Sequence, residues 1–330
     1  MGKRTRKSEE LLEEKEEKKE KKEKKEKNPK KPFLLESILL SIIFILIGIS
    51  IYLTIDILNK KEIYQKKIKE YEEKINDKNQ ELEDSKNKLD SYQNLDEKIE
   101  NTKKEYFSYL SELEKKIQEG TTDKKIAYLT FDDGPYYNTY RVFDILEEYD
   151  VKATFFTTNI NGEYCFDNKG VNCWDRYREY VERGHTIANH TYTHAIFRGL
   201  YSSTDSFMDA IINQENLIKE KTGGYVPNIV RFPGGSGTAG RLKDSIIERL
   251  RERGYGWVDW SSLDGDAEDV ANESAAWNYL MNTLGDNIEV ILFHDFSSIT
   301  TNILPDVIQY LRDNGYVLLP LFYDSVVVNK

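Results

Sequence analysis

Two adjacent carboxylates, Asp132 and Asp133, follow a short apolar run in the sequence TFDDGP. A β-rich run followed by Asp-Asp-Gly-Pro predicts a strand that ends in a turn and carries both acids at its C-terminal tip. Parallel α/β folds place their chemistry at that end of the strands. Because neighbouring side chains on a strand point different ways, the two acids need not share a role. An ordinary Asp-Gly turn with no catalytic function would contain the same residues. The rest of the chain must therefore show whether these two acids belong to an active site.

The four histidines of the chain all lie at or beside predicted strands. His190 and His194, in HTYTH, are four residues apart, so on a helical turn both imidazoles would face the same way. Two imidazoles and one carboxylate are a common catalytic zinc set, although two surface histidines would show the same spacing. His294, in ILFHD, ends another predicted strand, and an imidazole with a pKa of about 6.5 suits a general acid. His185 lies early in its strand and is interpreted as structural.

Two further ionisable residues lie at predicted strand ends. Arg231 closes a strand in VRFPGG, and Asp266 follows another in DWSSLDGDA. Taken singly, each is more often a salt-bridge or turn residue than part of an active site. Five strand ends that each offer an ionisable group predict a single constellation.

The elements that must position these residues begin at Thr121, where short β-rich runs start to alternate with amphipathic stretches. The predicted strands are 126–131, 153–158, 185–190, 228–233, 255–260, 289–295 and 316–321, and the predicted helices are 140–149, 205–221, 242–253, 271–284 and 303–314. This alternation predicts one α/β domain, a distorted (β/α) barrel of about seven parallel strands, closed or nearly closed.

The motifs, in this order, resemble those of the polysaccharide deacetylases, carbohydrate esterase family four, which share the NodB-homology domain. The resemblance extends over roughly residues 121 to 325. It implies that Asp132 is the general base. It also implies that Asp133, His190 and His194 hold one divalent metal ion, usually zinc, in each catalytic domain.

The same resemblance assigns the other motif residues. Arg231 would orient the base, and Asp266 would tune His294, which would protonate the leaving amine. Leu292 would line the pocket for the acetyl methyl group, and a backbone N–H near Gly234 would complete an oxyanion hole.

The substrate-binding residues implied in this way are Leu292, Pro233, Gly234 and Trp260. Two positions depart from the usual family pattern. Gly-Gly-Ser follows Pro233, where many relatives carry an aromatic residue, and Ala267 stands where a tryptophan is usual.

The first 58 residues predict a membrane anchor. Residues 1–32 contain fourteen Lys/Arg and nine Glu, which predicts a charged solvated tail. Residues 37–55 carry no charge and, at a helical rise of about 1.5 Å per residue, match a bilayer core. This run is longer than a typical signal peptide core and no small-x-small cleavage site follows, which favours a retained signal anchor over 33–58. Ten lysines in 15–32 against six in 59–75 predict a cytoplasmic N-terminus and an extracellular catalytic domain at 121–330.

A helical stalk is predicted over residues 59–120, because no Gly or Pro occurs between 60 and 119. A heptad places apolar residues or Tyr at twelve of sixteen seam positions. These twelve are Tyr64, Ile68, Tyr71, Ile75, Leu82, Leu89, Tyr92, Ile99, Tyr106, Leu110, Leu113 and Ile117. The other four, Lys78, Ser85, Asp96 and Lys103, are polar and weaken the seam. The sequence is compatible with both a homodimeric coiled coil and a single charged helix.

The net charge of the predicted catalytic domain bears on its ligands, and its two cysteines bear on its covalent structure. The formal charge of residues 121–330 is −12, which argues against nucleic acid as a ligand. Cys165 and Cys173 lie in one loop of the predicted extracellular domain, where either a disulfide or two free thiols is compatible with their spacing.

The combined hypothesis is a membrane-anchored, metal-dependent enzyme that removes acetyl groups from N-acetylglucosamine of cell-wall peptidoglycan. One alternative is deacetylation of another glycan, such as a chitin-like oligosaccharide, muramic acid residues or an O-acetylated polymer. A second alternative, of a different class, is a catalytically inactive scaffold that binds the wall.

Overall fold

The computed structural model describes residues 31–268 and 270–330, without the side chains of 31–33, 88–100, 102, 103, 105 and 163. The chain divides into two compact units, Met1–Asp84 and Ser85–Lys330. Nearly all of the predicted charged tail, and the side chains of the seam positions 89, 92, 96, 99 and 103, lie outside what the structure describes.

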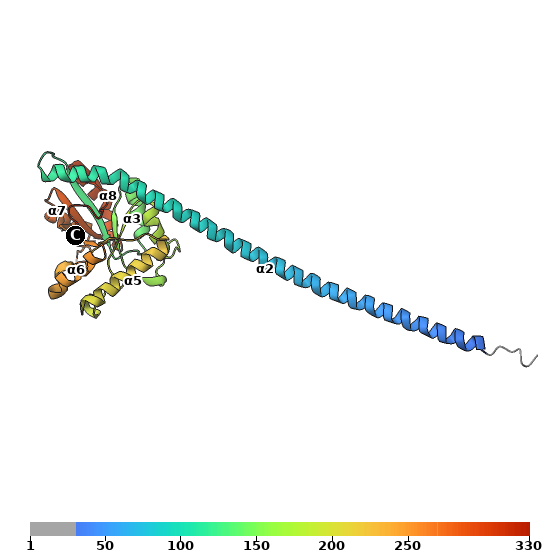
Figure 1. The fold of residues 1–330 in the computed structure, drawn as a ribbon. Helices are drawn as coiled ribbons and strands as arrows, with labels where there is room; N and C mark the ends of the chain where they lie inside the picture. The colour runs from blue at the N-terminus through green and yellow to red at the C-terminus, as the bar shows by residue number, and fades with distance from the viewer. Residues whose placement is uncertain (1–30, 269) are drawn as a thin grey trace, which may run out of the picture. The chain divides into compact units, whose positions relative to one another are not determined.

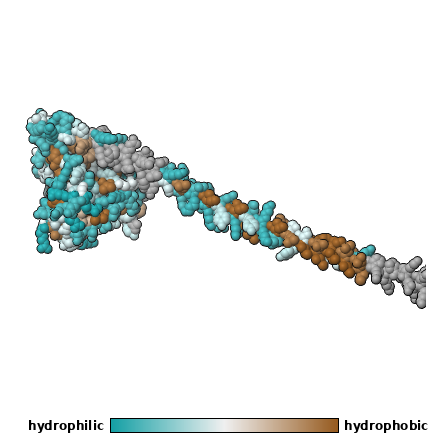
Figure 2. Space-filling model, in the orientation of Figure 1, coloured by the Kyte–Doolittle hydropathy of each residue, from teal (hydrophilic) through white to brown (hydrophobic). Residues whose placement is uncertain are grey.

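The first unit contains the N-terminal part of helix α2 (Lys31–Gln118). Within α2, Leu34–Asn87 is long and apolar enough to cross a membrane, by length and composition. Figure 2 shows apolar side chains gathered near the N-terminal end of this helix and mixed with hydrophilic ones further along it, and the large apolar residues between 34 and 58 are exposed. Among the described seam residues, Tyr64, Ile68, Tyr71 and Ile75 are exposed as well. Pairing of the stalk stays a prediction.

The second unit is built on an eight-stranded sheet (Figure 1). Its strands are β1 (Lys125–Asp132), β2 (Thr154–Thr157), β3 (Thr186–Asn189), β4 (Ile229–Val230), β5 (Gly256–Trp257), β6 (Ser262–Leu263), β7 (Ile288–His294) and β8 (Tyr316–Leu318). The order is β5-β4-β3-β2-β1-β7-β6, with β8 paired to β1, and all of these pairings are parallel. The predicted distorted barrel of parallel strands is confirmed. Sequence patterning missed β6, which is only two residues long.

Helices follow most of the strands. They are α3 (Thr139–Glu148), α4 (Arg176–Glu182), α5 (Thr204–Thr222), α6 (Lys243–Glu252), α7 (Glu273–Thr283) and α8 (Ser298–Asp313). The side chains of β1 alternate between two cores. Leu129 and Phe131 pack with apolar residues of α3 and α8, whereas Ile126 and Tyr128 lie in a second cluster on the other face of the strand.

The last turns of α2 contribute to that second cluster. Leu110 and Leu113 are buried there, and the Tyr128 hydroxyl donates to Glu114 Oε1 at 2.6 Å. The predicted division between stalk and catalytic domain at residue 120 stays a prediction, but these turns belong to the core of the second unit. A cavity of about 550 Å³ lies beside them, lined by Phe107, Tyr225 and other residues. None of the predicted site residues lines it.

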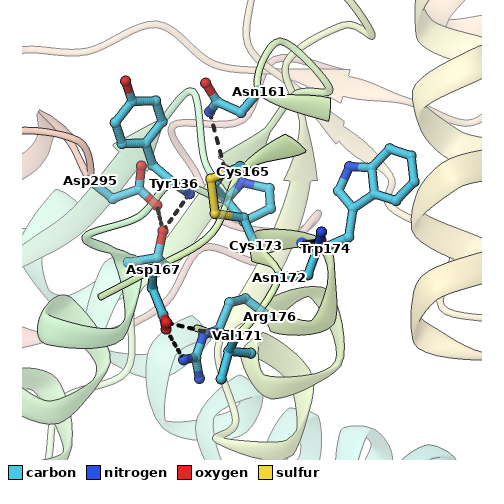
Figure 3. The surroundings of a disulfide bond; sticks show 12 residues. Tyr136, Asn161, Cys165, Asp167, Val171, Asn172, Cys173, Trp174, Arg176 and Asp295 are labelled. Carbon is cyan, nitrogen blue, oxygen red and sulfur yellow. Dashed lines mark hydrogen bonds and ion pairs between the residues drawn. A yellow bond between two sulfur atoms is a disulfide. The ribbon is translucent and has the colours of Figure 1, made fainter. Parts of the chain in front are cut away.

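The loop between β2 and α4 is closed by a disulfide between Cys165 and Cys173, as Figure 3 shows. Within it, the buried Asp167 pairs with Arg176. Asn161 Nδ2 donates to the Pro135 carbonyl at 3.2 Å, so the loop is tied to the turn that follows β1.

Candidate active site

The turn after β1 gives the two acids different surroundings. Asp132 is buried at the strand tip, whereas Asp133 has a left-handed backbone conformation with φ of 72°. Such residues are strained, and here the Thr158 amide donates to the Gly134 carbonyl (2.8 Å) and its hydroxyl to the Asp133 carbonyl (3.1 Å). Position 134 requires glycine, because a Cβ atom there would lie 2.2 Å from Asp295 Oδ2.

Asp133, His190 and His194 form a cluster that suits a metal ion. One ligand atom from each lies within 4.8 Å of the others. Asp133 Oδ1 is buried without a hydrogen-bond partner in the described part of the chain, and it lies 3.8 Å from His190 Nε2 and 3.7 Å from His194 Nε2. One carboxylate oxygen and two imidazole nitrogens are the donors that zinc and similar divalent ions accept. The three residues therefore fit a divalent metal ion.

The orientation of His190 is set by the backbone. Its Nδ1 lies 2.8 Å from the Arg231 carbonyl, so Nδ1 carries the proton and Nε2 is left as a ligand. Burial lowers the pKa of His190 to about 3, which keeps the imidazole neutral, as a ligand must be.

The expectation that HTYTH forms a helical turn is wrong. The segment after β3 is a bend in which Thr191 and His194 have φ of 68° and 48°. Two left-handed residues bring the imidazoles together, with ring centroids 4.9 Å apart. The His194 amide donates to the Thr191 hydroxyl at 3.2 Å, which helps to hold the bend.

Arg231 lies behind Asp132. Its side chain is fully buried, and Nη1 donates to Asp132 Oδ1 at 2.9 Å and to the Thr130 hydroxyl at 2.8 Å. The other carboxylate oxygen, Asp132 Oδ2, lies 3.5 Å from His190 Nε2 and so faces the metal-ligand cluster. Burial raises the pKa of Asp132, and the charge of Arg231 opposes that rise.

His294, at the tip of β7, pairs in register with Asp132 and lies beside the cluster. Its Nδ1 lies 2.7 Å from Asp266 Oδ1, and its backbone amide donates to Asp266 Oδ2 at 2.8 Å. Burial disfavours the charged imidazole, but the hydrogen bond and charge of Asp266 outweigh it and raise the pKa of His294 to about 9. Its Nε2 lies 4.0 Å from Asp133 Oδ2. The ring therefore presents a protonated Nε2 to the cluster.

Comparison with known proteins agrees with this geometry. Residues 119–256 match the family model for polysaccharide deacetylase. The chain is 31% identical over 199 residues to a peptidoglycan-N-acetylglucosamine deacetylase of Bacillus cereus, covering 59% of this chain and 68% of that protein. It is 30% identical to a chitin deacetylase of Colletotrichum lindemuthianum, covering 59% of this chain and 77% of that protein. The chain belongs to the polysaccharide deacetylase family. It is a hydrolase that acts on amide bonds.

A solved structure agrees as well. The catalytic domain of a peptidoglycan N-acetylglucosamine deacetylase from Eubacterium rectale superposes with a TM-score of 0.56 and 32% identity, covering 63% of this chain and 93% of that domain. The similarity thus includes nearly the whole of a known deacetylase domain.

The predicted substrate residues of this deacetylase lie on the strands and turns that carry the site. Leu292 is buried on β7 and pairs in register with Thr130. Pro233 and Gly234 follow Arg231, and the half-buried Trp260 lies beside them, since a Cβ atom at Gly235 would be 3.2 Å from its ring. The indole thus occupies space next to the turn at Gly235. Ala267 is exposed.

Sequence reasoning missed four buried or half-buried polar residues of the deacetylase site: Asp259, Asp264, Asp295 and Thr300. Asp259 accepts hydrogen bonds from the Ser236 amide (2.9 Å) and hydroxyl (2.6 Å) and so holds the turn after Pro233. Asp295 is fully buried and accepts from the Thr139 hydroxyl. The dipeptide His-Asp and the repeat Asp-Gly-Asp were the only signals, because burial is not visible in a loop sequence.

Proposed function

We propose that this deacetylase removes acetyl groups from N-acetylglucosamine of cell-wall peptidoglycan, with one divalent metal ion, zinc in the first instance. The observation that carries the proposal is that Asp132 and His294, paired in register on β1 and β7, both lie beside the cluster formed by Asp133, His190 and His194. Two proton-carrying groups around a metal-ligand set are what amide hydrolysis requires. The substrate is supported by the names of the similar Bacillus cereus and Eubacterium rectale deacetylases.

Asp132 would act as the base. Arg231 holds Oδ1, so Oδ2 is left to accept a proton from the attacking water. A divalent ion, when bound, would supply Lewis acidity that lowers the pKa of water and polarises the acetyl carbonyl. Asp133, His190 and His194 would hold that ion, because a carboxylate and two imidazole nitrogens are donors that such an ion accepts.

His294 would act as the acid. Asp266 fixes Nδ1, so Nε2 delivers its proton to the amine nitrogen as the C–N bond breaks. Leu292 would contact the acetyl methyl group, and a backbone N–H near Gly234 would stabilise the developing oxyanion. Pro233 and Trp260 would line the sugar-binding groove.

We also propose that α2 anchors the enzyme as a single-pass membrane protein, with the N-terminus in the cytoplasm and the catalytic domain outside. The stalk would then pair with a second copy along its seam. Replacing a seam residue, Ile75→Glu, should abolish the dimer in detergent, whereas Ile63→Glu should not, because Ile63 is exposed but lies off the seam. Sedimentation of the full chain measures this. A monomeric wild type would reject the dimer.

A chitin-like oligosaccharide is the second candidate substrate, because the chitin deacetylase of Colletotrichum lindemuthianum is of comparable identity. Muramic acid residues and O-acetylated polymers use the same chemistry and belong in the same assay. An inactive wall-binding scaffold would need neither the metal-ligand cluster nor the buried Arg231–Asp132 pair.

The test measures acetate released from N-acetylated peptidoglycan by the full chain in detergent, with zinc added, after chelation, and as Asp132→Asn. Asp306→Asn, on the exposed face of α8, is the matched control. We expect metal-dependent release that Asp132→Asn abolishes and Asp306→Asn preserves. Acetate release from a chitin oligosaccharide but not from peptidoglycan would show that the substrate is a chitin-like glycan. A pure protein that binds no metal and releases no acetate from any of these glycans would refute the enzymatic proposal.

A further inference from the structure

Two buried carboxyl groups share one hydroxyl group behind His294. The Thr300 Oγ1 atom lies 2.7 Å from Asp264 Oδ2 and 2.6 Å from Asp266 Oδ2. Asp264 and Thr300 are both fully buried. A threonine hydroxyl has a single proton and can donate to only one of two acceptors. If both acids were ionised, one carboxylate oxygen would lie against the Thr300 hydroxyl oxygen with no proton between the two atoms. An unsatisfied charged oxygen in a buried site is costly.

The hydrogen bonds show which acid keeps the negative charge. Asp266 receives the backbone amide and Nδ1 of His294 as well as Thr300, so its carboxylate is well satisfied. Among the described residues, Asp264 receives the Asp266 amide, at 3.1 Å on Oδ1, and no other donor apart from the contact with Thr300. Burial and the neighbouring charge of Asp266 raise the pKa of Asp264 well above its usual value. The proton therefore belongs on Asp264 Oδ2.

We propose that Asp264, as a neutral carboxylic acid, and Thr300 are positioning residues for the Asp266–His294 pair. Asp264 Oδ2 donates to Thr300 Oγ1, and Thr300 donates to Asp266 Oδ2, which leaves Asp266 Oδ1 for His294. This deepens the function proposed above and rests on it where activity is concerned.

The arrangement explains how a loop carboxylate is held still. Asp266 lies in a turn after β6, but it is bound through both oxygens, which prevents rotation about its terminal bond. Thr300 lies in the first turn of α8, where its amide donates to the Ser297 hydroxyl at 3.1 Å, so the hydroxyl group comes from a rigid element. A neutral Asp264 supplies this support without adding a second negative charge near His294.

The test compares two pairs of variants of the full chain in detergent. Thr300→Val and Asp264→Leu remove the hydrogen bonds, whereas Thr300→Ser and Asp264→Asn retain them. An asparagine can accept the Asp266 amide through Oδ1 and donate to Thr300 through its NH2 group, as the neutral acid does. We expect kcat to fall by about 10- to 100-fold in the first pair at unchanged KM, and to stay within about threefold of wild type in the second.

A second readout does not depend on activity. With 15N-labelled histidine, the Nδ1 proton of His294 should give a slowly exchanging low-field signal in the wild type, Thr300→Ser and Asp264→Asn. This signal should shift or be lost in Thr300→Val and Asp264→Leu. If no glycan is deacetylated, the function proposed above fails while this measurement still decides the positioning role.

Three outcomes would overturn the inference. The kcat of Asp264→Asn could fall as far as that of Asp264→Leu, which would mean that the charge of Asp264 is needed. All four variants could keep kcat and the His294 signal. Thr300→Val could lower only the unfolding temperature, with kcat and the signal of the folded protein unchanged, which would make the pair merely structural.

Discussion

Replacing Asp266 by asparagine should move the alkaline limb of the pH–rate profile. Burial lowers the pKa of His294, but the hydrogen bond and charge of Asp266, together with the charges of Asp132 and Asp133, raise it from 6.5 to about 9. Each pKa unit is worth about 1.4 kcal/mol, so a rise from 6.5 to about 9 corresponds to roughly 3 kcal/mol in favour of the imidazolium, with Asp266 as the largest favourable contribution. In Asp266→Asn the largest favourable contribution is lost while burial remains, so the pKa of His294 should fall to about 6.5.

The size of the effect follows from the protonated fraction. At pH 8, about nine-tenths of a His294 with a pKa of about 9 is protonated, against about 3% at a pKa of 6.5. The activity of Asp266→Asn should therefore be about 30-fold or more below wild type at pH 8. Between pH 6.5 and 9 the ratio of wild-type to variant activity should rise from about twofold to about 160-fold.

The assay is kcat/KM for acetate release from pH 5.5 to 9.5, with Asp306→Asn as control. The contribution of the Asp266–His294 pair to the stability of the fold also decreases as the pH rises. Because the folded pKa of His294 lies above the unfolded value, the pair stabilises the fold fully below pH 6.5 and loses this contribution as the pH rises through 9. A ratio of activities that does not change with pH would refute the claim that Asp266 holds the acid proton.

Three further predictions concern stability, each measured by urea unfolding. Gly134→Ala should lower the free energy of unfolding by about 1–3 kcal/mol, since its Cβ would meet a buried carboxylate, whereas Gly237→Ala, with open space around it, should be nearly neutral. Burial lowers the pKa of His185 to about 3, so the unfolded chain binds an extra proton below pH 6.5; His185→Gln should therefore lose about 2 kcal/mol less than wild type between pH 8 and pH 5, and an unchanged slope would contradict this. Replacing Cys165 and Cys173 by serine should cost about 2.5 kcal/mol from the loop entropy of the unfolded chain and leave metal binding intact; loss of metal would show that the loop supports the site.

Many elements of this protein can be read from the sequence. The seven predicted strands and five predicted helices all occur, because the apolar pattern of each segment is local and the strands are flanked by turn residues. The positions of Asp132, His190 and His294 at strand tips follow from the same patterns. The apolar helix within α2 also needs no tertiary information, since length and composition define it.

Other features depend on contacts between distant segments. The bend at Thr191 and His194 replaces the predicted helical turn, because the imidazoles must meet Asp133 on another strand and left-handed residues achieve this. The burial of Leu110 and Leu113 is equally invisible in a heptad pattern, since a seam facing a second helix and one facing a barrel have the same period.

The amino-acid sequence by itself determined the type and order of the reactive groups, because strand ends and motif spacing are local properties. Only the tertiary structure decided which groups share a proton. Asp264 lies 36 residues from Thr300, and both look like ordinary turn and helix residues until burial removes water from around them. Burial and the proximity of a second charge, not residue type, set the protonation state, and both arise only when distant segments pack together.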